Sequence, residues 1–548
     1  MMHMKVRKII NGLFALSVSL LLASCGTTVK QAAAPQPELA AVQLAPVVRS
    51  ADTPSEGVYY CIFVRSFADS NGDGIGDFNG IAKKLDYLND GNDLTTGDLG
   101  VTGIWLLPIY PSQTYHGYDV DDYYSTNPDY GTMDDFQNLV NECRKRGISV
   151  ILDMTCNHSS VYNQWFIDSR NPDDPHRTWY RWISADDPRY SINQQIWGHK
   201  VWNLYKGYYY AGLFGSSMPD YNLDDPALRQ EFKNVMKFWL DKGVAGFRYD
   251  AASHVYNSAK TPAGTNSVEK GVAWWKEITS YDRSVRADAF TVGEVWEPTS
   301  TRAQYIAGLG SGFHFDMGTK IVDEIRSGNA GNNSFANGLQ GEYERYAESN
   351  PDYIDAPFLS NHDQNRIAGL LRGQVPQLKL AAAMYVFTEG VPFIYYGEEI
   401  GMMGAKPDEQ LRTPMMWNKP GRDKLQTTWE SSRYNKNTLT VAEQAKNPDS
   451  LLRFYKRIIR IKTAHPALYE GRFKAVNTGN EFVSSWVMEC DTEKAFVLHN
   501  LSSNTVTVNL PAGYNLPIVF TTYPGTAITS GGQLTIPPFC SAVLAGRK

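Results

Sequence analysis

The sequence predicts an α/β protein: a (β/α)8 TIM barrel with a subdomain inserted after the third strand and an antiparallel β-sandwich at the carboxyl end. Three observations lead to this prediction. Short apolar runs alternate with segments of helical period up to about residue 467, polar side chains follow several of these runs, and period-two segments without helices follow from about residue 468. Alternating strands and helices form parallel sheets, and eight such units close into a barrel.

The apolar runs are the predicted barrel strands, and amphipathic segments between them are the predicted helices. The segment 226–242 places its large apolar residues on one face and ends at Gly243, and similar segments cover 133–146 and 450–464. The eight predicted strands are Val58–Val64, Val101–Ile109, Ile148–Met154, Val244–Tyr249, Phe290–Val295, Gly312–Met317, Ala356–Ser360 and Val391–Tyr396.

Two regions depart from the strand–helix alternation. A long connection after the third predicted strand is rich in Tyr, Trp, Asp and Pro, which is typical of a functional excursion or a small subdomain. Short period-two runs near the carboxyl end, such as Thr505–Leu510, indicate antiparallel strands. The predicted domains are a barrel over 56–467, an inserted subdomain over 159–217 and a β domain over 468–548.

The amino terminus is predicted to be a targeting segment. Basic residues precede the apolar stretch Ile9–Ala23, which is shorter than the ~20 residues that span a bilayer. The stretch ends in Leu22-Ala-Ser-Cys-Gly26, which resembles the lipobox of bacterial lipoproteins; the alternative is an ordinary signal peptide with an incidental cysteine. We therefore expect a signal peptide over 1–25, a flexible tether over 26–55, and export with a lipid anchor at Cys25 on the bacterial cell membrane or surface.

Composition excludes some partners and leaves others open. The formal charge is −6 and no basic block occurs, so we expect no nucleic acid partner. We also expect membrane contact only through the lipid anchor, and a monomer. The 32 Tyr, 23 Phe and 13 Trp either pack the core or stack on sugar rings. Cys490 and Cys540 either pair or stay free, and the remaining cysteines Cys61, Cys143 and Cys156 lie in apolar patterns typical of buried thiols.

Chemically active side chains follow four of the predicted strands. In a TIM barrel such groups gather at the carboxyl ends of the strands. Polar residues that only keep a protein soluble would not be expected to gather at the ends of four of the eight predicted strands. The segments are Asp153-Met-Thr-Cys-Asn-His158, Gly246-Phe-Arg-Tyr-Asp-Ala-Ala-Ser-His254, Val292-Gly-Glu-Val-Trp296 and Ser360-Asn-His-Asp-Gln-Asn-Arg366.

These four segments resemble the signature regions of the α-amylase family of glycoside hydrolases, family 13. The resemblance covers nearly the whole chain after the tether, and it includes Met218-Pro-Asp-Tyr-Asn222 and Tyr115-His-Gly-Tyr-Asp119. The sequence is most similar to bacterial lipoprotein α-amylases whose fifth region begins Met-Pro-Asp, a feature shared with neopullulanase-like and oligo-1,6-glucosidase-like members.

The resemblance implies a role for each rim residue. Asp250 is the expected nucleophile, Glu294 the general acid/base and Asp363 the carboxylate that grips the sugar and stabilises the transition state. Arg248, two residues before Asp250, should keep that carboxylate ionised, and Glu294 should have a raised pKa. The expected substrate-binding residues are Tyr118, His158, Arg248, His254 and His362.

The expected reaction is retaining, internal hydrolysis of α-1,4-glucosidic bonds in starch, maltodextrins or related α-glucans. Tyr115 stands where oligo-1,6-glucosidases carry a pocket-closing Asp, and Ser253 stands where many α-amylases carry Lys. The alternatives are a neopullulanase/cyclomaltodextrinase-like or oligo-1,6-glucosidase-like enzyme with transglycosylation, and a non-catalytic starch-binding surface lipoprotein. Four aromatic residues of the insertion either line the cleft or form its core: Trp202, Tyr208, Tyr209 and Tyr210.

A Gly-rich acidic loop, DSNGDGIGD at 69–77, follows the first predicted strand. An EF-hand is excluded because the preceding element is a strand and the twelfth position is Gly80 instead of Glu. The family resemblance favours a structural Ca²⁺ site over a polar turn without an ion, and Asn157 matches the barrel ligand of a second family site. The expected oxygen donors are Asp69, Asn71, Asp73, the carbonyl of Ile75, and Asp77.

Overall fold

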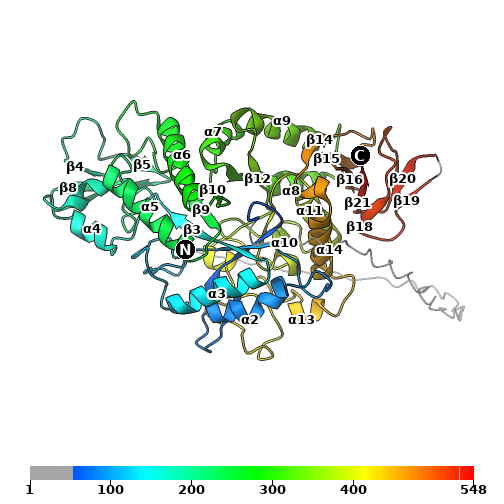
Figure 1. Cartoon of the computed structure of the whole chain (residues 1–548), viewed down its shortest axis with the longest axis horizontal. Coiled ribbons are helices and arrows are strands. Elements are labelled where there is room, and N and C mark those ends of the chain that lie inside the picture. The colour runs from blue at the N-terminus through cyan, green and yellow to red at the C-terminus, as the bar shows by residue number, and fades with distance from the viewer. Residues whose placement is uncertain (1–52, 530) are drawn as a thin grey trace, which may run out of the picture. The chain divides into compact units, whose positions relative to one another are not determined.

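Eight parallel strands form the central sheet of the computed structural model, which describes residues 53–529 and 531–548 (Figure 1). The strands pair in the order β12-β11-β10-β9-β3-β2-β1-β13, so neighbours in the sequence are mostly neighbours in the sheet. The predicted (β/α)8 barrel is therefore confirmed. The strands are β1 (Tyr59–Ile62), β2 (Gly103–Leu106), β3 (Ser149–Thr155), β9 (Gly246–Asp250), β10 (Phe290–Gly293), β11 (Ser311–Phe313), β12 (Ile354–Ala356) and β13 (Phe393–Tyr395).

Helices alternate with these strands, and several of them begin at a residue whose side chain caps the first turn. Thr132 and Asp135 form a reciprocal capping box on α3, and Asp225 caps α5, whose first residue is Pro226. The longer helices are α2 (Phe78–Leu88), α3 (Met133–Lys145), α5 (Pro226–Asp241), α6 (Ser267–Val285), α7 (Thr299–Leu309), α8 (Met317–Ser327), α9 (Ser334–Ser349), α11 (Val375–Val386) and α14 (Leu451–Ala464). The shorter ones are α1 (Val64–Phe67), α10 (Ile367–Leu370), η2 (Glu398–Ile400), α12 (Asp408–Leu411), α13 (Val441–Gln444) and α15 (Pro466–Tyr469).

Two predicted strands were misplaced. The run Ala356–Ser360 shares only Ala356 with β12, because the strand begins at Ile354 and includes a charged residue, Asp355. Asp355 is buried and bonds His314 Nδ1 at 3.0 Å, so a polar side chain occupies a position where an apolar pattern was expected. The run that began at Gly312 is a strand only to Phe313, because α8 starts at Met317.

The segment after β3 holds short helices and two small antiparallel sheets. Its elements are α4 (Gln164–Ser169), η1 (Pro175–Trp179), β4 (Trp182–Ile183), β5 (Gln195–Ile196), β6 (His199–Lys200), β7 (Trp202–Tyr205) and β8 (Tyr208–Ala211). Trp202 is 3% exposed within a small core with Ile183 and Leu213, and Tyr209 packs against the same core. Trp202 and Tyr209 thus belong to the interior of the insertion, whereas Tyr208 is exposed and lies under the Arg177 guanidinium.

The carboxyl-terminal strands form two antiparallel sheets that enclose their own apolar core, as the sequence predicted. Trp486 ties this region to the barrel, because its indole N–H donates to the carbonyl of Phe387 at 3.0 Å. Cys490 and Cys540 are both free thiols, and the buried state of Cys61, Cys143 and Cys156 is confirmed. The strands are β14 (Arg472–Ala475), β15 (Val483–Glu489), β16 (Glu493–Asn500), β17 (Val506–Asn509), β18 (Ile518–Thr521), β19 (Ala527–Ile528), β20 (Gln533–Ile536) and β21 (Ser541–Arg547).

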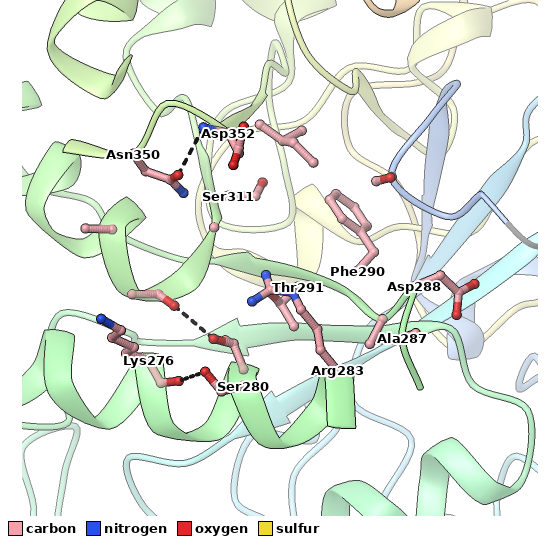
Figure 2. A pocket seen from close by; sticks show the side chains of 17 residues that line it. Lys276, Ser280, Arg283, Ala287, Asp288, Phe290, Thr291, Ser311, Asn350 and Asp352 are labelled. Atoms are coloured by element: carbon pink, nitrogen blue, oxygen red, sulfur yellow. Dashed lines mark hydrogen bonds between the residues drawn. The ribbon is translucent and has the colours of Figure 1, made fainter. Parts of the chain in front are cut away.

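A cavity of about 470 Å³ lies at the amino ends of β10 and β11, beside α6 (Figure 2). Lys276, Arg283, Phe290 and Ser311 are among the residues that line it. Glu294 follows the opposite, carboxyl end of β10, and Asp250 is the last residue of the neighbouring strand β9, so this cavity is not the candidate active site.

The predicted signal peptide, lipobox and most of the tether lie outside the described residues. Across residues 53–529 and 531–548, no helix is both long enough and apolar enough to cross a membrane.

Candidate active site

Three carboxylates from adjacent strands meet on the guanidinium of Arg248. Nη1 of Arg248 lies 2.7 Å from Asp153 Oδ1 and 2.6 Å from Asp250 Oδ1, and Nη2 lies 2.7 Å from Glu294 Oε2. The Arg248 side chain is completely buried, whereas the Glu294 side chain remains 16% exposed. One buried cation therefore holds together the ends of β3, β9 and β10, whose labels lie together in Figure 1.

The sheet register brings Asp250 and Glu294 level with each other. Tyr249 pairs with Gly293, and the amide of Glu294 donates to the carbonyl of Tyr249 at 2.9 Å. Neighbouring strands lie roughly 4.8 Å apart. The two carboxyl groups thus extend side by side from adjacent strands.

Ala251, directly after Asp250, has an unusual backbone conformation that bears on Glu294. Its φ of 46° lies in the left-handed region, which is strained for a residue with a Cβ. In this conformation its N–H donates to Glu294 Oε2 at 2.8 Å. The chain directly after Asp250 therefore helps to orient the Glu294 carboxylate.

The charges of this cluster do not balance if every carboxyl group is ionised. Burial raises the pKa of Asp250, Glu294 and Asp153 raise it further, and the Arg248 charge opposes them. Burial also raises the pKa of Asp153. The contribution expected of Arg248 is present, but burial outweighs it. One guanidinium carries one positive charge, so three carboxyl groups around it favour a state in which the cluster retains a proton. A nucleophile and a general acid need such a state, because one carboxyl group must be ionised and the other protonated.

Asp363 has cationic partners of its own beside that cluster. Its carboxylate lies between Arg412 Nη2, at 2.9 Å, and His362 Nε2, at 3.0 Å. Burial alone would raise the pKa of Asp363, but His362 and Arg412 outweigh it and hold that pKa well below its usual range. These partners therefore favour the ionised form of Asp363.

The remaining predicted residues surround these carboxylates. The Tyr118 ring stacks on His362 at 5.6 Å, and its hydroxyl donates to Asp153 Oδ2 at 3.1 Å. Burial lowers the pKa of His158 to about 3 and that of His254 to about 4, so both imidazoles are neutral near pH 7. Phe214 lies between these two rings, with centroids at 5.2 and 5.7 Å.

Sequence reasoning missed several residues of this site. Asp153 ends an apolar run and was visible as a polar residue at a strand end, but no role was assigned to it. Arg412 comes from the loop after β13, and besides Asp363 it bonds the carbonyl of His362 at 3.0 Å. No periodic pattern surrounds Arg412 or Phe214, so only their positions in space reveal their roles.

A buried lysine contacts Asn157, the residue that matches the barrel ligand of the second calcium site of the family. The Lys260 side chain is fully buried, and its ammonium donates to Asn157 Oδ1 at 2.6 Å and to Asp220 Oδ1 at 2.9 Å. The other Asp220 oxygen accepts the N–H of Leu213, in the insertion, at 2.6 Å. These oxygens do not fit a second Ca²⁺, because an ammonium already stands between them.

The loop 69–77 is closed by its own hydrogen bonds. Asp69 accepts the N–H groups of Asn71, Gly72 and Gly74, and Asp77 accepts those of Ser70 and Gly80. Within residues 53–529 and 531–548, no group of three or more His, Cys, Asp or Glu side chains is close enough together to hold a metal ion. The Ca²⁺ site therefore stays a prediction that depends on the oxygen donors of the loop.

Comparisons with known proteins agree with this geometry. Residues 61–471 match the family described as "Alpha amylase, catalytic domain", and residues 483–543 match "Alpha-amylase SusG C-terminal domain". The chain is 41% identical to Alpha-amylase 3 of Dictyoglomus thermophilum, over 82% of this chain and 86% of that one. It is 30% identical to a 4-alpha-glucanotransferase of Thermotoga maritima, over 82% and 96%.

Among solved structures, an alpha-amylase from H. orenii superposes with a TM-score of 0.82 at 38% identity, covering 90% of this chain and all of that one. The family match spans most of the chain and includes all the carboxylates that converge at the rim. The chain is therefore a glycoside hydrolase that belongs to the α-amylase family.

Proposed function

We propose that this protein is a retaining α-glucan hydrolase that cleaves internal α-1,4 bonds of starch and maltooligosaccharides by double displacement. Asp250 attacks the anomeric carbon, and Glu294 protonates the leaving oxygen and then activates water. Asp363, with His362 and Tyr118 beside it, binds the hydroxyl groups of the ring under attack.

The observation that carries this proposal is the guanidinium of Arg248, which forms ion pairs with both Asp250 and Glu294 at the ends of paired strands. Retaining glycosidases hold their two carboxyl groups about 5–5.5 Å apart, whereas inverting ones need about 6.5–9.5 Å for a water molecule. Side-by-side carboxylates on adjacent strands support the shorter separation and hence a covalent glycosyl-enzyme intermediate.

Internal cleavage is supported by the residue beside the candidate site at position 115. Tyr115 stacks on Trp429 with ring centroids 5.4 Å apart, and the Arg412 guanidinium lies over its ring. The two aromatic rings offer a surface on which further sugar rings of the chain can stack. A carboxylate at this position would instead bind the end of a chain. The names of relatives, which include 4-alpha-glucanotransferase and oligo-1,6-glucosidase, keep transglycosylation as the second candidate function. Pure starch binding is disfavoured because Asp250, Glu294 and Asp363 are all present.

The stereochemistry of the product tests the mechanism. Proton NMR during hydrolysis of maltoheptaose should show the α-anomer first, because two displacements restore the configuration. Initial β-anomer would contradict the double displacement.

Chromatography of products from amylose, pullulan, β-cyclodextrin and isomaltose measures the specificity in the same preparation. Products longer than supplied maltotriose would favour the transferase alternative.

We also propose that the loop 69–77 binds one structural Ca²⁺. Support comes from a donor set made only of oxygen, which suits Ca²⁺ better than Zn²⁺, and from the positive φ of Gly72 and Gly74, which lets the loop wrap tightly. Removal of the ion with EDTA should lower the melting temperature, and added CaCl₂ should restore it. No shift with EDTA, together with no calcium by elemental analysis, would refute the site. Asp73→Ala removes one of the proposed oxygen donors, so it should abolish the EDTA effect. The Asp73 side chain is exposed, so the substitution should not disturb the core.

For location, we propose export and lipid attachment at Cys25, on the strength of the lipobox-like sequence. Labelling with a radioactive fatty acid in a bacterial host, with Cys25→Ser as the control, tests this proposal.

A further inference from the structure

The inserted segment presents one tryptophan at the tip of a hairpin. Strands β5 and β6 pair Ile196 with His199, so Trp197 and Gly198 form a two-residue turn. Both have positive φ, 49° and 87°, which is the pattern of a type I′ turn. The Trp197 side chain is 58% exposed.

Local stability does not explain a tryptophan at this position. Type I′ turns favour Asn-Gly, whereas a bulky residue at positive φ is a conformational outlier. Isolated exposed apolar side chains are common and need no explanation. Trp197 differs because it combines exposure, an unfavourable backbone and aromatic neighbours that belong to the candidate active site.

Those neighbours connect Trp197 to the catalytic carboxylates. Its ring centroid lies 5.3 Å from that of His254 and 5.2 Å from that of Phe214. The amide of His254 donates to the carbonyl of Ala251, and the amide of Ala251 donates to Glu294. A short series of direct contacts thus leads from the proposed general acid to the exposed indole.

We infer that Trp197 is a stacking platform for a glucosyl unit on the leaving-group side of the scissile bond, an inference that rests on the proposed function. Glu294 would protonate the leaving oxygen, so residues reached through Glu294 and His254 face the sugars that depart. Asp363, His362 and Tyr118 form a separate contact set around the ring under attack. The apolar face of a pyranose packs on an exposed aromatic ring, and neutral His254 can hydrogen-bond its hydroxyl groups.

The test compares two substrates that differ in their leaving group. Maltoheptaose places glucosyl units on the leaving-group side, whereas α-maltosyl fluoride releases only fluoride. In Trp197→Asn the ratio of kcat/KM for maltoheptaose to that for α-maltosyl fluoride should fall by about tenfold. Asparagine suits the turn, so the melting temperature should stay equal or rise.

Two further variants keep the result interpretable. Trp197→Phe should restore most of the ratio, because it returns an aromatic face. Phe482→Asn removes another exposed aromatic side chain, in the carboxyl-terminal sandwich, and should leave the ratio unchanged.

An unchanged ratio in Trp197→Asn would overturn the inference and leave the proposed function intact. A ratio that falls equally in Phe482→Asn would also overturn it. A wild-type enzyme that is inactive on both substrates would instead refute the proposed function, and the platform with it.

Discussion

Replacing Asp250 by Asn should reduce the hydrolysis of maltoheptaose by about 10⁴-fold or more while the fold persists. An amide cannot attack the anomeric carbon, and the register of β9 and β10 places the Asp250 carboxylate beside Glu294. The substitution also removes one of the anions that face Arg248, so the melting temperature should not fall by much. Initial rates and circular dichroism measure the two effects separately.

The matched control for Asp250→Asn is Asp282→Asn. Asp282 is buried on α6, accepts the hydroxyl of Tyr249 from the same strand that carries Asp250, and has a pKa raised to about 7 by burial. The activity of Asp282→Asn should stay within a fewfold of wild type, because Asp282 lies outside the rim cluster.

Azide should restore turnover of α-maltosyl fluoride by Asp250→Gly and yield the β-azide. Near-normal hydrolysis by Asp250→Asn would remove Asp250 from the nucleophile role.

Replacing Lys260 by Met should cost about 3–5 kcal/mol of the free energy of unfolding, because it leaves the buried Asp220 carboxylate without its cation. The expected fall in melting temperature is on the order of several degrees. The joint between the barrel and the insertion should open first, since Asp220 also holds the backbone of Leu213. Hydrogen exchange of the insertion amides measures this local opening.

Lys462→Met is the control for that change. Lys462 is also fully buried, but its ammonium donates to the carbonyl of Thr388, and burial lowers its pKa to about 7. Its loss removes a weakly held charge and should cost no more than about 1 kcal/mol. The double variant Lys260→Met, Asp220→Asn should recover part of the lost stability. Equal losses in the two single lysine variants would contradict the role of the Lys260–Asp220 pair.

The barrel could be predicted because its strands are apolar runs between amphipathic helices. One of the two misplaced strands, β12, contains Asp355, whose buried carboxylate bonds His314 and Tyr343. The cysteines show a different limit: Cys490 and Cys540 both fall in the β-sandwich, yet both are free. Whether two residues meet in a β region depends on strand order, which composition does not reveal.

The candidate carboxylates could be located in the sequence because each lies at or after the end of a strand, where a barrel gathers its active groups; their catalytic roles stay predictions. Arg412 and Lys260 could not be located in this way, because each lies in irregular chain far from its partners in sequence. Trp197 was hidden for another reason. The aromatic run at 208–210 stands out in the sequence, whereas Trp197 is a single aromatic residue among mostly polar neighbours, and only the structure shows it exposed beside Phe214 and His254.

The Lys260 ammonium has a consequence for the conditions in which the enzyme works. A metal ion held by mass action leaves its site when the surrounding concentration falls below the dissociation constant. A cation on the polypeptide has a fixed effective concentration that dilution and chelators do not change. The link between Asn157 and Asp220 should therefore persist in calcium-poor or chelating media. EDTA should act at the 69–77 loop alone, without loosening the insertion that carries Trp197.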